Sequence, residues 1–204
     1  MPNKTVVRKI FEELYSKENG YLISRQARKK RGINDRKLTY GEVKFESFYE
    51  IIKQVSPTSD KIFYDLGSGN GKAVILASLF GNFKKLVGIE ILDELVVSAK
   101  RILTKYKKLL KEKLPEKLKQ EIKFVKADIL KTDFSEADVV FTHSTCFDEE
   151  FMKALAEKME GLKKGSFVIT ITQTLPSKSF QQVKKRTVEL SWGEGTVYFW
   201  EKIR

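Results

Sequence analysis

Residues 64–71 have the sequence Tyr-Asp-Leu-Gly-Ser-Gly-Asn-Gly and are the most informative part of the chain. They follow the apolar run 62–64 and lead into residues 73–77, which are expected to be helical. A second apolar run, residues 86–90, ends in an acid. A strand, a glycine turn, a helix and a second strand that ends in an acid form the pattern that binds an adenosine-containing cofactor. The sequence therefore predicts a nucleotide-binding α/β fold.

The spacing of the glycines narrows the choice of cofactor. Sites for nicotinamide or flavin cofactors usually have the spacing Gly-x-Gly-x-x-Gly, which places a pyrophosphate on a helix N-terminus. Here Asp65 is followed by Gly67, Gly69 and Gly71 at every second position. An acid at the end of the first strand would repel a pyrophosphate but suits a cationic ligand such as S-adenosylmethionine, which carries an ammonium and a sulfonium. Glu90, at the end of the second strand, is expected to accept hydrogen bonds from the ribose hydroxyls.

The length and composition fit a single domain with a short extension. The chain has 204 residues, of which 41% are hydrophobic, and this is enough for one buried core. A single cysteine, Cys146, excludes an internal disulfide, fits a reducing compartment and is expected to be a small core residue. No apolar run is long enough to cross a bilayer, and residues 1–4 lack the apolar core of a secretory signal. We therefore expect an intracellular protein without a membrane partner, with nucleus and cytoplasm both open.

The net charge of +12 is concentrated in two segments. Residues 100–131 contain twelve Lys or Arg against four Asp or Glu, and residues 25–37 contain seven against one. Such clusters attract nucleic acid, an acidic nucleosomal surface or an anionic membrane, but they also occur on solvated helices. We interpret residues 100–131 as a solvated helix. For the second segment both interpretations stay open, as does a nuclear address. Its candidate contacts to a nucleosome or nucleic acid are Arg25, Arg28, Lys29, Lys30 and Arg31.

Hydrophobic spacing divides the chain into an N-terminal extension, residues 1–38, and an α/β domain, residues 39–204. Apolar residues at helical spacing predict helices, and short apolar runs predict strands. The predicted helices are 5–16, 45–52 (ending before Pro57), 93–114 and 151–159, and the further predicted strands are 121–125, 138–142, 167–172, 187–192 and 196–202. The basic segment 19–38 is aperiodic and is expected to be an irregular arm.

Local signals add detail to this layout. Asp93 is predicted to be the N-cap of the long helix, because a carboxylate favours a helix N-terminus. The last two strands are predicted to form a β-hairpin that turns at residues 193–195, Gly-Glu-Gly. Strands that alternate with helices and end in a hairpin indicate a mostly parallel sheet with an antiparallel edge.

Five short motifs carry a resemblance that extends from about residue 38 to the end of the chain. They are Tyr-Gly-Glu at 40–42, Asp-Leu-Gly-Ser-Gly at 65–69, Gly-Ile-Glu at 88–90, Ala-Asp-Ile at 127–129 and Ser-Trp at 191–192. The glycine motif resembles that of class I S-adenosylmethionine-dependent methyltransferases, and the combination resembles the disruptor-of-telomeric-silencing family of non-SET histone lysine methyltransferases. The resemblance implies a Rossmann-like sheet and methyl transfer from S-adenosylmethionine to a lysine of a protein, such as a histone or another chromatin protein.

The resemblance also implies a set of cofactor contacts. Asp65 would face the methionine end of the cofactor, Glu90 the ribose and Asp128 the adenine. Tyr40 and Glu42 would lie on a loop that closes over the methionine moiety. The full implied set is Tyr40, Glu42, Asp65, Gly67, Ser68, Gly69, Gly71, Lys72, Glu90, Asp128 and Ile129.

The residues implied on the acceptor side are Tyr40, His143, Ser144, Trp192 and Phe199. Trp192 and Phe199 would line a channel for the lysine with Tyr40, and ordinary packing on the hairpin is the alternative for both. Lysine has an ordinary pKa of about 10.4, and an apolar channel next to a sulfonium disfavours its charged form. His143 is expected to orient the acceptor by a hydrogen bond, with a purely structural role as the alternative. No metal is expected.

The chain departs from the family's pattern at two places. Lys72 stands where the family usually has glutamine, and residues 142–147 are Thr-His-Ser-Thr-Cys-Phe where the histone enzymes have paired asparagines followed by phenylalanine. A nucleic-acid amino-methyltransferase would suit the basic charge, but the Asn-Pro-Pro-Tyr type of signature is absent after the fourth strand. A small-molecule methyltransferase and a non-catalytic cofactor-binding module remain as alternatives. We expect a monomer.

Overall fold

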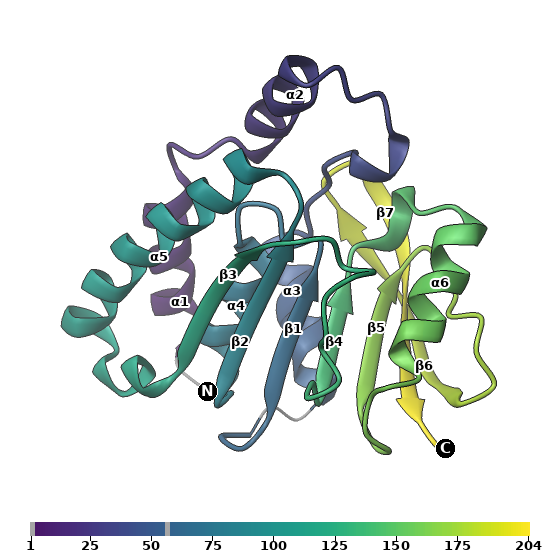
Figure 1. Ribbon diagram of the computed structural model, residues 1–204. Coiled ribbons are helices and arrows are strands. Elements are labelled where there is room, and N and C mark those ends of the chain that lie inside the picture. The colour runs from purple at the N-terminus through teal and green to yellow at the C-terminus, as the bar shows by residue number, and fades with distance from the viewer. Residues whose placement is uncertain (1–2, 56–57) are drawn as a thin grey trace.

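A computed structural model describes residues 3–55 and 58–204, and these residues form one seven-stranded sheet in the order β3-β2-β1-β4-β5-β7-β6 (Figure 1). Strands β1 to β5 are parallel, and β7 is antiparallel to both β5 and β6. The strands are β1 Ile62–Leu66, β2 Lys85–Glu90, β3 Glu121–Lys126, β4 Val139–Thr142, β5 Phe167–Ile171, β6 Phe180–Leu190 and β7 Gly193–Lys202. The Rossmann-like sheet with an antiparallel C-terminal hairpin, as predicted from the sequence, is confirmed.

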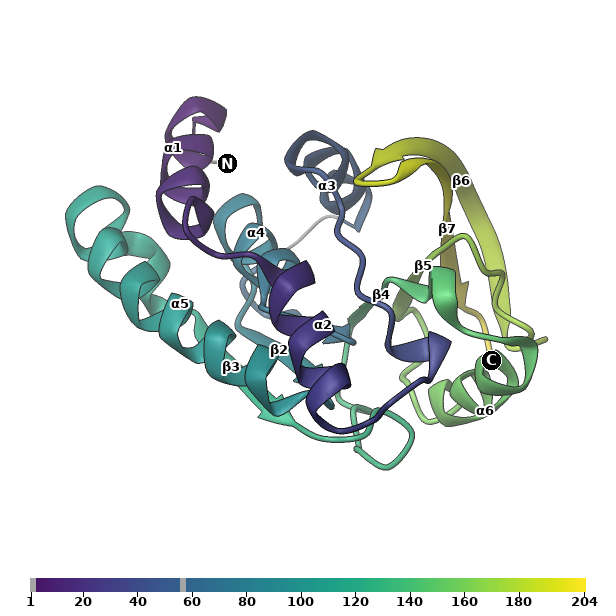
Figure 2. The ribbon, with the colours of Figure 1, turned by 90° about the horizontal axis from the view of Figure 1, so that it is seen from above.

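Helices cover both faces of the sheet and bury two hydrophobic clusters (Figures 1 and 2). The larger cluster joins the sheet to α1, α3, α4 and α5, and the smaller one joins the opposite face to α6. The helices are α1 Lys4–Tyr15, α2 Gly20–Lys30, α3 Phe45–Ile52, α4 Lys72–Phe80, α5 Asp93–Lys113 and α6 Glu149–Met159, with short 3-10 turns at η1 Arg36–Leu38, η2 Lys53–Val55, η3 Pro115–Lys119 and η4 Ser144–Cys146. Pro57, which was expected to follow the third helix, lies outside the described residues. No helix within residues 3–55 and 58–204 is long and apolar enough to cross a membrane.

The expectation of an irregular basic arm over residues 19–38 is wrong. Residues Gly20–Lys30 form helix α2, and the side chain of Asn19 caps its N-terminus by accepting a hydrogen bond of 3.0 Å from the Leu22 N–H. The buried face of α2 consists of Gly20, Ser24 and Ala27. These small residues carry no hydrophobic periodicity, and this is why the helix escaped sequence analysis. Helix α2 lies across the carboxyl ends of the parallel strands (Figures 1 and 2).

Two local predictions also need correction. The hairpin turns at Ser191 and Trp192, not at residues 193–195, because Leu190 pairs with Gly193 and the strands continue from there. Helix α5 begins at Asp93 itself, with Leu92 as its N-cap residue. The N–H group of Leu92 donates to the carboxylate of Glu90 at 2.9 Å. The acid that bonds the backbone next to the helix start is therefore Glu90 of β2, and not Asp93. Strand β6 contains a bulge at residue 183, where the pairing shifts between Gln182 and Lys184.

Candidate functional site

A cavity of about 270 Å³ opens at the carboxyl ends of the parallel strands. Its walls come from the segments that follow β1, β2, β3 and β4, and it is closed by α2 and by residues 35–41. A smaller cavity of about 30 Å³ adjoins it, and both are lined by Tyr40, Gly67 and His143. In a doubly wound α/β sheet this edge is where ligands bind. The two cavities therefore form one candidate site with a larger and a smaller compartment.

The glycine loop between β1 and α4 lines both cavities. The N–H groups of Gly67 and Ser68 each donate to the Ile89 carbonyl at 2.9 Å, which fixes the loop to β2. Gly67 and Gly69 have φ angles of 84° and 56°, a left-handed region that strains other residues. The backbone thus lies open to a ligand where any Cβ would crowd it.

Two buried acids give this site a negative character. The Glu90 carboxylate accepts hydrogen bonds from the N–H groups of Gly69 at 2.9 Å and Ile91 at 2.8 Å, and it lines the larger cavity. Asp65 is 2% exposed and lines the smaller cavity. Burial raises the pKa of both acids, and the charge of Glu90 raises the pKa of Asp65 further. A cationic ligand would relieve this electrostatic cost.

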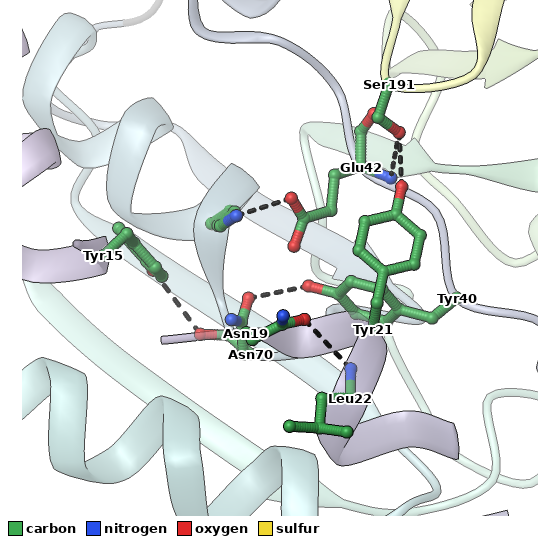
Figure 3. Close-up of polar contacts among 9 residues, drawn as sticks. Tyr15, Asn19, Tyr21, Leu22, Tyr40, Glu42, Asn70 and Ser191 are labelled. Atoms are coloured by element: carbon green, nitrogen blue, oxygen red, sulfur yellow. Dashed lines mark hydrogen bonds and ion pairs between the residues drawn. The ribbon is translucent and has the colours of Figure 1, made fainter. Parts of the chain in front are cut away.

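Tyr40 covers the glycine loop from the side of α2 (Figure 3). Its hydroxyl donates to Oδ1 of Asn70 at 2.8 Å, and its ring packs edge-on against Tyr21 with the ring centroids 5.2 Å apart. Burial together with the nearby charge of Glu42 raises the pKa of Tyr40, so the phenol stays a neutral donor. The start of α2, the Tyr40 segment and the glycine loop are thus packed into one unit.

Glu42 connects the Tyr40 segment to the C-terminal hairpin (Figure 3). The hydroxyl of Ser191 donates to the Glu42 carbonyl at 3.0 Å, and Val43 forms an isolated antiparallel bridge with Leu190. The Glu42 carboxylate lies 2.5 Å from Nζ of Lys72, the first residue of α4. The Tyr-Gly-Glu and Ser-Trp motifs, far apart in the sequence, are therefore in direct contact, and the first of them lines the smaller cavity.

His143 and Trp192 form the rim of the site on the hairpin side. Their rings pack edge-on with centroids 4.7 Å apart, and Trp192 is 46% exposed. A Cβ on Gly41 would lie 2.8 Å from the Trp192 ring, so only glycine lets the segment pass so close. Burial lowers the pKa of His143 to about 4, and its Nε2 atom is buried without a hydrogen-bond partner among the described residues. The imidazole is therefore neutral near pH 7 and presents an unused polar atom.

The remaining cofactor residues implied by the resemblance also have definite places. Asp128 and Ile129 line the larger cavity, where the Asp128 carboxylate accepts a 2.9 Å hydrogen bond from the Leu130 N–H. Ser68 and Lys72 line the smaller cavity. Gly71 lies outside both cavities and is the N-cap of α4, with a φ of 87°.

Two residues expected on the acceptor side are not brought to the site. Phe199 is 2% exposed and lies in the larger hydrophobic cluster, because alternate side chains of β7 face opposite sides of the sheet. Ser144 is fully buried outside both cavities, and its hydroxyl donates to the Ile171 carbonyl at 2.8 Å. The positions of Phe199 and Ser144 thus indicate packing and a local backbone contact, and they contradict a place in an acceptor channel.

Sequence analysis missed the residues that close the site from above. Ser24 of α2 lines the larger cavity, together with residues 35–39 and the aromatic pair Phe147 and Phe151. Asn70 was also not predicted: its Oδ1 accepts a hydrogen bond from the Tyr40 hydroxyl at 2.8 Å, and its carbonyl accepts one from the Tyr15 hydroxyl at 3.4 Å. The sequence signal available for α2 was its N-cap residue, Asn19.

Unused buried polar atoms indicate what the site accommodates. Side-chain atoms of Ser24, Glu42, Ser68 and His143 are buried without a hydrogen-bond partner in the described part of the chain, and all four residues line a cavity. Such atoms are costly unless something binds them. Within the described residues there is no cluster of three or more side chains that could hold a metal ion. The arrangement fits an elongated polar ligand with positive charge at the Asp65 end.

Comparison with known proteins shows that the chain is similar to proteins named as lysine methyltransferases. The family model for "Histone methylation protein DOT1" matches residues 28–192. A "Histone-lysine N-methyltransferase, H3 lysine-79 specific" from Caenorhabditis elegans is 28% identical over 79% of this chain and 19% of its own length. A "Protein-lysine N-methyltransferase" from Saccharolobus islandicus is 33% identical over 55% of this chain and 63% of its own. The chain spans a quarter or less of the histone enzymes that it matches.

Solved structures support the fold. An RNA methyltransferase from Salinibacter ruber, in complex with S-adenosyl-L-homocysteine, superposes with a TM-score of 0.58 and 24% identity over 76% of this chain and 90% of its own. This likeness shows the fold alone. The family model covers most of the chain, including the Tyr-Gly-Glu, glycine-loop and Ser-Trp motifs. The chain therefore belongs to the histone methylation protein DOT1 family.

Proposed function

We propose that this chain transfers a methyl group from S-adenosylmethionine to the side-chain amine of a lysine in a protein. The observation that carries the proposal is the pair of buried acids, Asp65 and Glu90, placed on either side of the glycine loop in two connected cavities. The raised pKa values of both acids mean that their charged forms are unfavourable in the site unless a positive charge lies nearby. When bound, the cofactor would supply an activated methyl group on a cationic sulfur.

The chain's own residues would hold the cofactor along the two cavities. Asp65 would accept a hydrogen bond from its ammonium, and Glu90 would accept hydrogen bonds from the ribose hydroxyls. Asp128 and Ile129 would contact the adenine by a hydrogen bond and by apolar packing. Tyr40 and Glu42 would cover the methionine moiety, since both line the smaller cavity.

The acceptor lysine would enter beside Trp192 and His143. An apolar, partly desolvated passage disfavours the ammonium form, so the lysine arrives as a neutral amine. The unused Nε2 of His143 would accept a hydrogen bond from that amine and so direct its lone pair toward the methyl carbon. The bound cofactor would supply the methyl group on its sulfur, the amine would take it as the bond to sulfur breaks, and the amine's extra proton would leave to solvent. The chain contributes chiefly position and desolvation.

A basic surface next to the site suits contact with a nucleosome or nucleic acid. Arg25, Lys29, Lys30 and Arg31 are exposed on α2, the helix that covers the cavity. Arg31 is paired with Glu94 at 2.8 Å, which leaves less of its charge for a partner. We propose that Arg25, Arg28, Lys29 and Lys30 attract a polyanionic partner while its lysine reaches Trp192.

The test is to incubate the purified chain with radiolabelled S-adenosylmethionine and separate pools of histones, nucleosomes, cell-lysate proteins and nucleic acid. Label confined to protein, and recovered as methyl-lysine after hydrolysis, is the expected result. Label in nucleic acid would overturn the proposal. Cofactor binding without label in any pool would instead favour a small-molecule substrate or a non-catalytic module.

Two variant sets separate the parts of this proposal. Asp65→Ala should abolish labelling while circular dichroism shows a retained fold. The double variant Arg25→Glu/Lys29→Glu should weaken nucleosome or DNA binding and flatten its dependence on salt. A matched control, Lys107→Glu/Lys111→Glu, places the same charge change on exposed positions of α5. Equal loss in both double variants would show that only net charge matters and would contradict a docking role for α2.

A further inference from the structure

The hydroxyl of Ser24 is a buried polar group with no partner in the protein. Ser24 is 1% exposed, and its Oγ atom makes no hydrogen bond within the described residues. A serine inside a helix commonly bonds back to a carbonyl of the preceding turn, but this hydroxyl does not. Buried hydroxyls without a partner are costly, so a native one calls for an explanation.

The position of Ser24 supplies that explanation. It is the only residue of α2 that lines the larger cavity, within the described residues, and it does so from the side opposite the strand ends. It does not line the smaller cavity, where Asp65 and Lys72 lie. Ser24 therefore belongs to the compartment that contains Glu90, Asp128 and Ile129, and its Oγ atom is the buried polar atom without a partner in that part of the described wall.

The packing of α2 fixes Ser24 in this place. At one end of the helix, Gly20 packs directly against the Tyr40 ring. At the other end, Arg31 pairs with Glu94 in the first turn of α5. Between these two anchors, Ser24 lines the same cavity as Ile91, whose N–H group donates to the Glu90 carboxylate at 2.8 Å. A ligand held by Glu90 would thus lie beneath α2.

We propose that Ser24 is a ligand-binding residue, whose hydroxyl hydrogen-bonds to the nucleoside half of the cofactor. This inference rests on the proposed function and extends it to a helix that begins before the region matched by the family model, residues 28–192. Helix α2 is then part of the binding site, in addition to covering it.

The proposal predicts that Ser24→Ala weakens ligand binding without lowering the stability of the ligand-free protein. Without ligand the variant should unfold at the same temperature as the wild type or higher, because a buried hydroxyl without a partner is removed. With ligand it should bind S-adenosylhomocysteine about 3- to 10-fold more weakly, the usual range for the loss of one hydrogen bond. A serine that only packs would leave the affinity for S-adenosylhomocysteine unchanged in the alanine variant, whether or not the unfolding temperature falls.

A matched control is Ser166→Ala at the start of β5. Ser166 is also buried, but its hydroxyl donates to the Ala137 carbonyl at 3.0 Å, at the end of the sheet away from the cavity. This control should lower the unfolding temperature and leave ligand affinity unchanged. Calorimetric titration and thermal unfolding of both variants provide the two readouts.

The choice of ligand separates this inference from the proposed function. Methylthioadenosine keeps the nucleoside half of the cofactor and lacks its amino-acid part, so Ser24→Ala should weaken its binding by the same factor as that of S-adenosylhomocysteine. Unchanged affinity for both ligands in Ser24→Ala would overturn the inference, and a loss confined to S-adenosylhomocysteine would overturn the nucleoside assignment. Failure of the wild type to bind either ligand would overturn the proposed function itself, and the inference with it.

Discussion

The ammonium of Lys72 lies 2.5 Å from the carboxylate of Glu42, and this ion pair joins the start of α4 to the Tyr40 segment across the smaller cavity. A positive side chain in the first turn of a helix opposes the helix dipole, so the acid is needed to balance it. The other carboxylate oxygen of Glu42 is buried without a hydrogen-bond partner in the described residues. The ammonium of Lys72 thus compensates the negative charge of the largely buried Glu42 carboxylate.

Lys72→Met is expected to destabilise the protein by about 1–3 kcal/mol, because it leaves the Glu42 carboxylate partly buried without its cation. The double variant Lys72→Met/Glu42→Gln should recover much of this loss, and chemical unfolding of the single and double variants measures the coupling. Lys85→Met is a suitable control, since Lys85 pairs with Glu136 at 2.5 Å away from the cavities. Strictly additive effects of Lys72 and Glu42 would contradict a direct interaction.

Asp65→Asn is expected to stabilise the ligand-free protein near neutral pH while it abolishes cofactor binding. Burial and Glu90 raise the pKa of Asp65, so the folded state holds a proton that the unfolded state has lost. Stability therefore falls as the pH rises from the ordinary pKa of about 3.9 toward the raised value. Unfolding temperatures from pH 4 to 8 should show that the variant lacks part of this slope. A uniform loss of stability at every pH would show that the carboxylate is instead a structural anchor.

His143 is expected to titrate near pH 4, well below its ordinary value of about 6.5. Because it is the only histidine, its ring protons give isolated signals in a proton NMR titration. Between about pH 6.5 and pH 4 the histidine is protonated in the unfolded chain but not in the folded one. The free energy of unfolding should therefore fall as the pH drops through this window. His143→Gln should remove this component. A midpoint near 6.5 would mean that the imidazole is hydrated and would weaken its assignment to the site.

Trp192→Ala is expected to lower kcat/KM for a protein substrate by about tenfold or more, since it removes the exposed wall of the acceptor passage. Its affinity for S-adenosylhomocysteine should stay unchanged, because Trp192 lies outside both cavities. Phe199→Leu provides the contrast: it should lower stability by about 1–2 kcal/mol, as expected for a buried core position, with kcat/KM of the folded protein retained. Loss of kcat/KM in Phe199→Leu, with kcat/KM retained in Trp192→Ala, would instead assign Phe199 to the acceptor passage.

The parts of this fold that sequence predicted well are those fixed by local chemistry. The glycine loop, the acids that end its neighbouring strands and the apolar strands each carry their signal within a few residues. Helix α2 carries no such signal, because its buried face is made of the small residues Gly20, Ser24 and Ala27. Small residues form a buried face without an apolar stripe, so hydrophobic periodicity does not report the helix.

The acceptor side was less predictable because it depends on contacts between distant segments. Gly-Glu-Gly at 193–195 is a strong local turn signal, yet the strands pair through it and turn at Ser191 and Trp192. Ser191 is held there by the backbone of Glu42, a contact that spans most of the chain. Because the turn lies at residues 191–192, Trp192 packs against His143 at the rim of the site. Because Phe199 pairs with Ile169 in the middle of the sheet, its side chain does not reach that rim.

The bulge at residue 183 has a consequence for how copies of this protein behave together. Strand β6 is one outer strand of the sheet, and a long outer strand offers unpaired N–H and carbonyl groups to another chain. The bulge interrupts that row, and exposed Lys184 and Lys185 follow it directly. The opposite outer strand, β3, carries exposed Lys123 and Lys126. Charge repulsion and broken register thus protect both borders of the sheet from strand addition, so we expect concentrated solutions to resist fibrillar association.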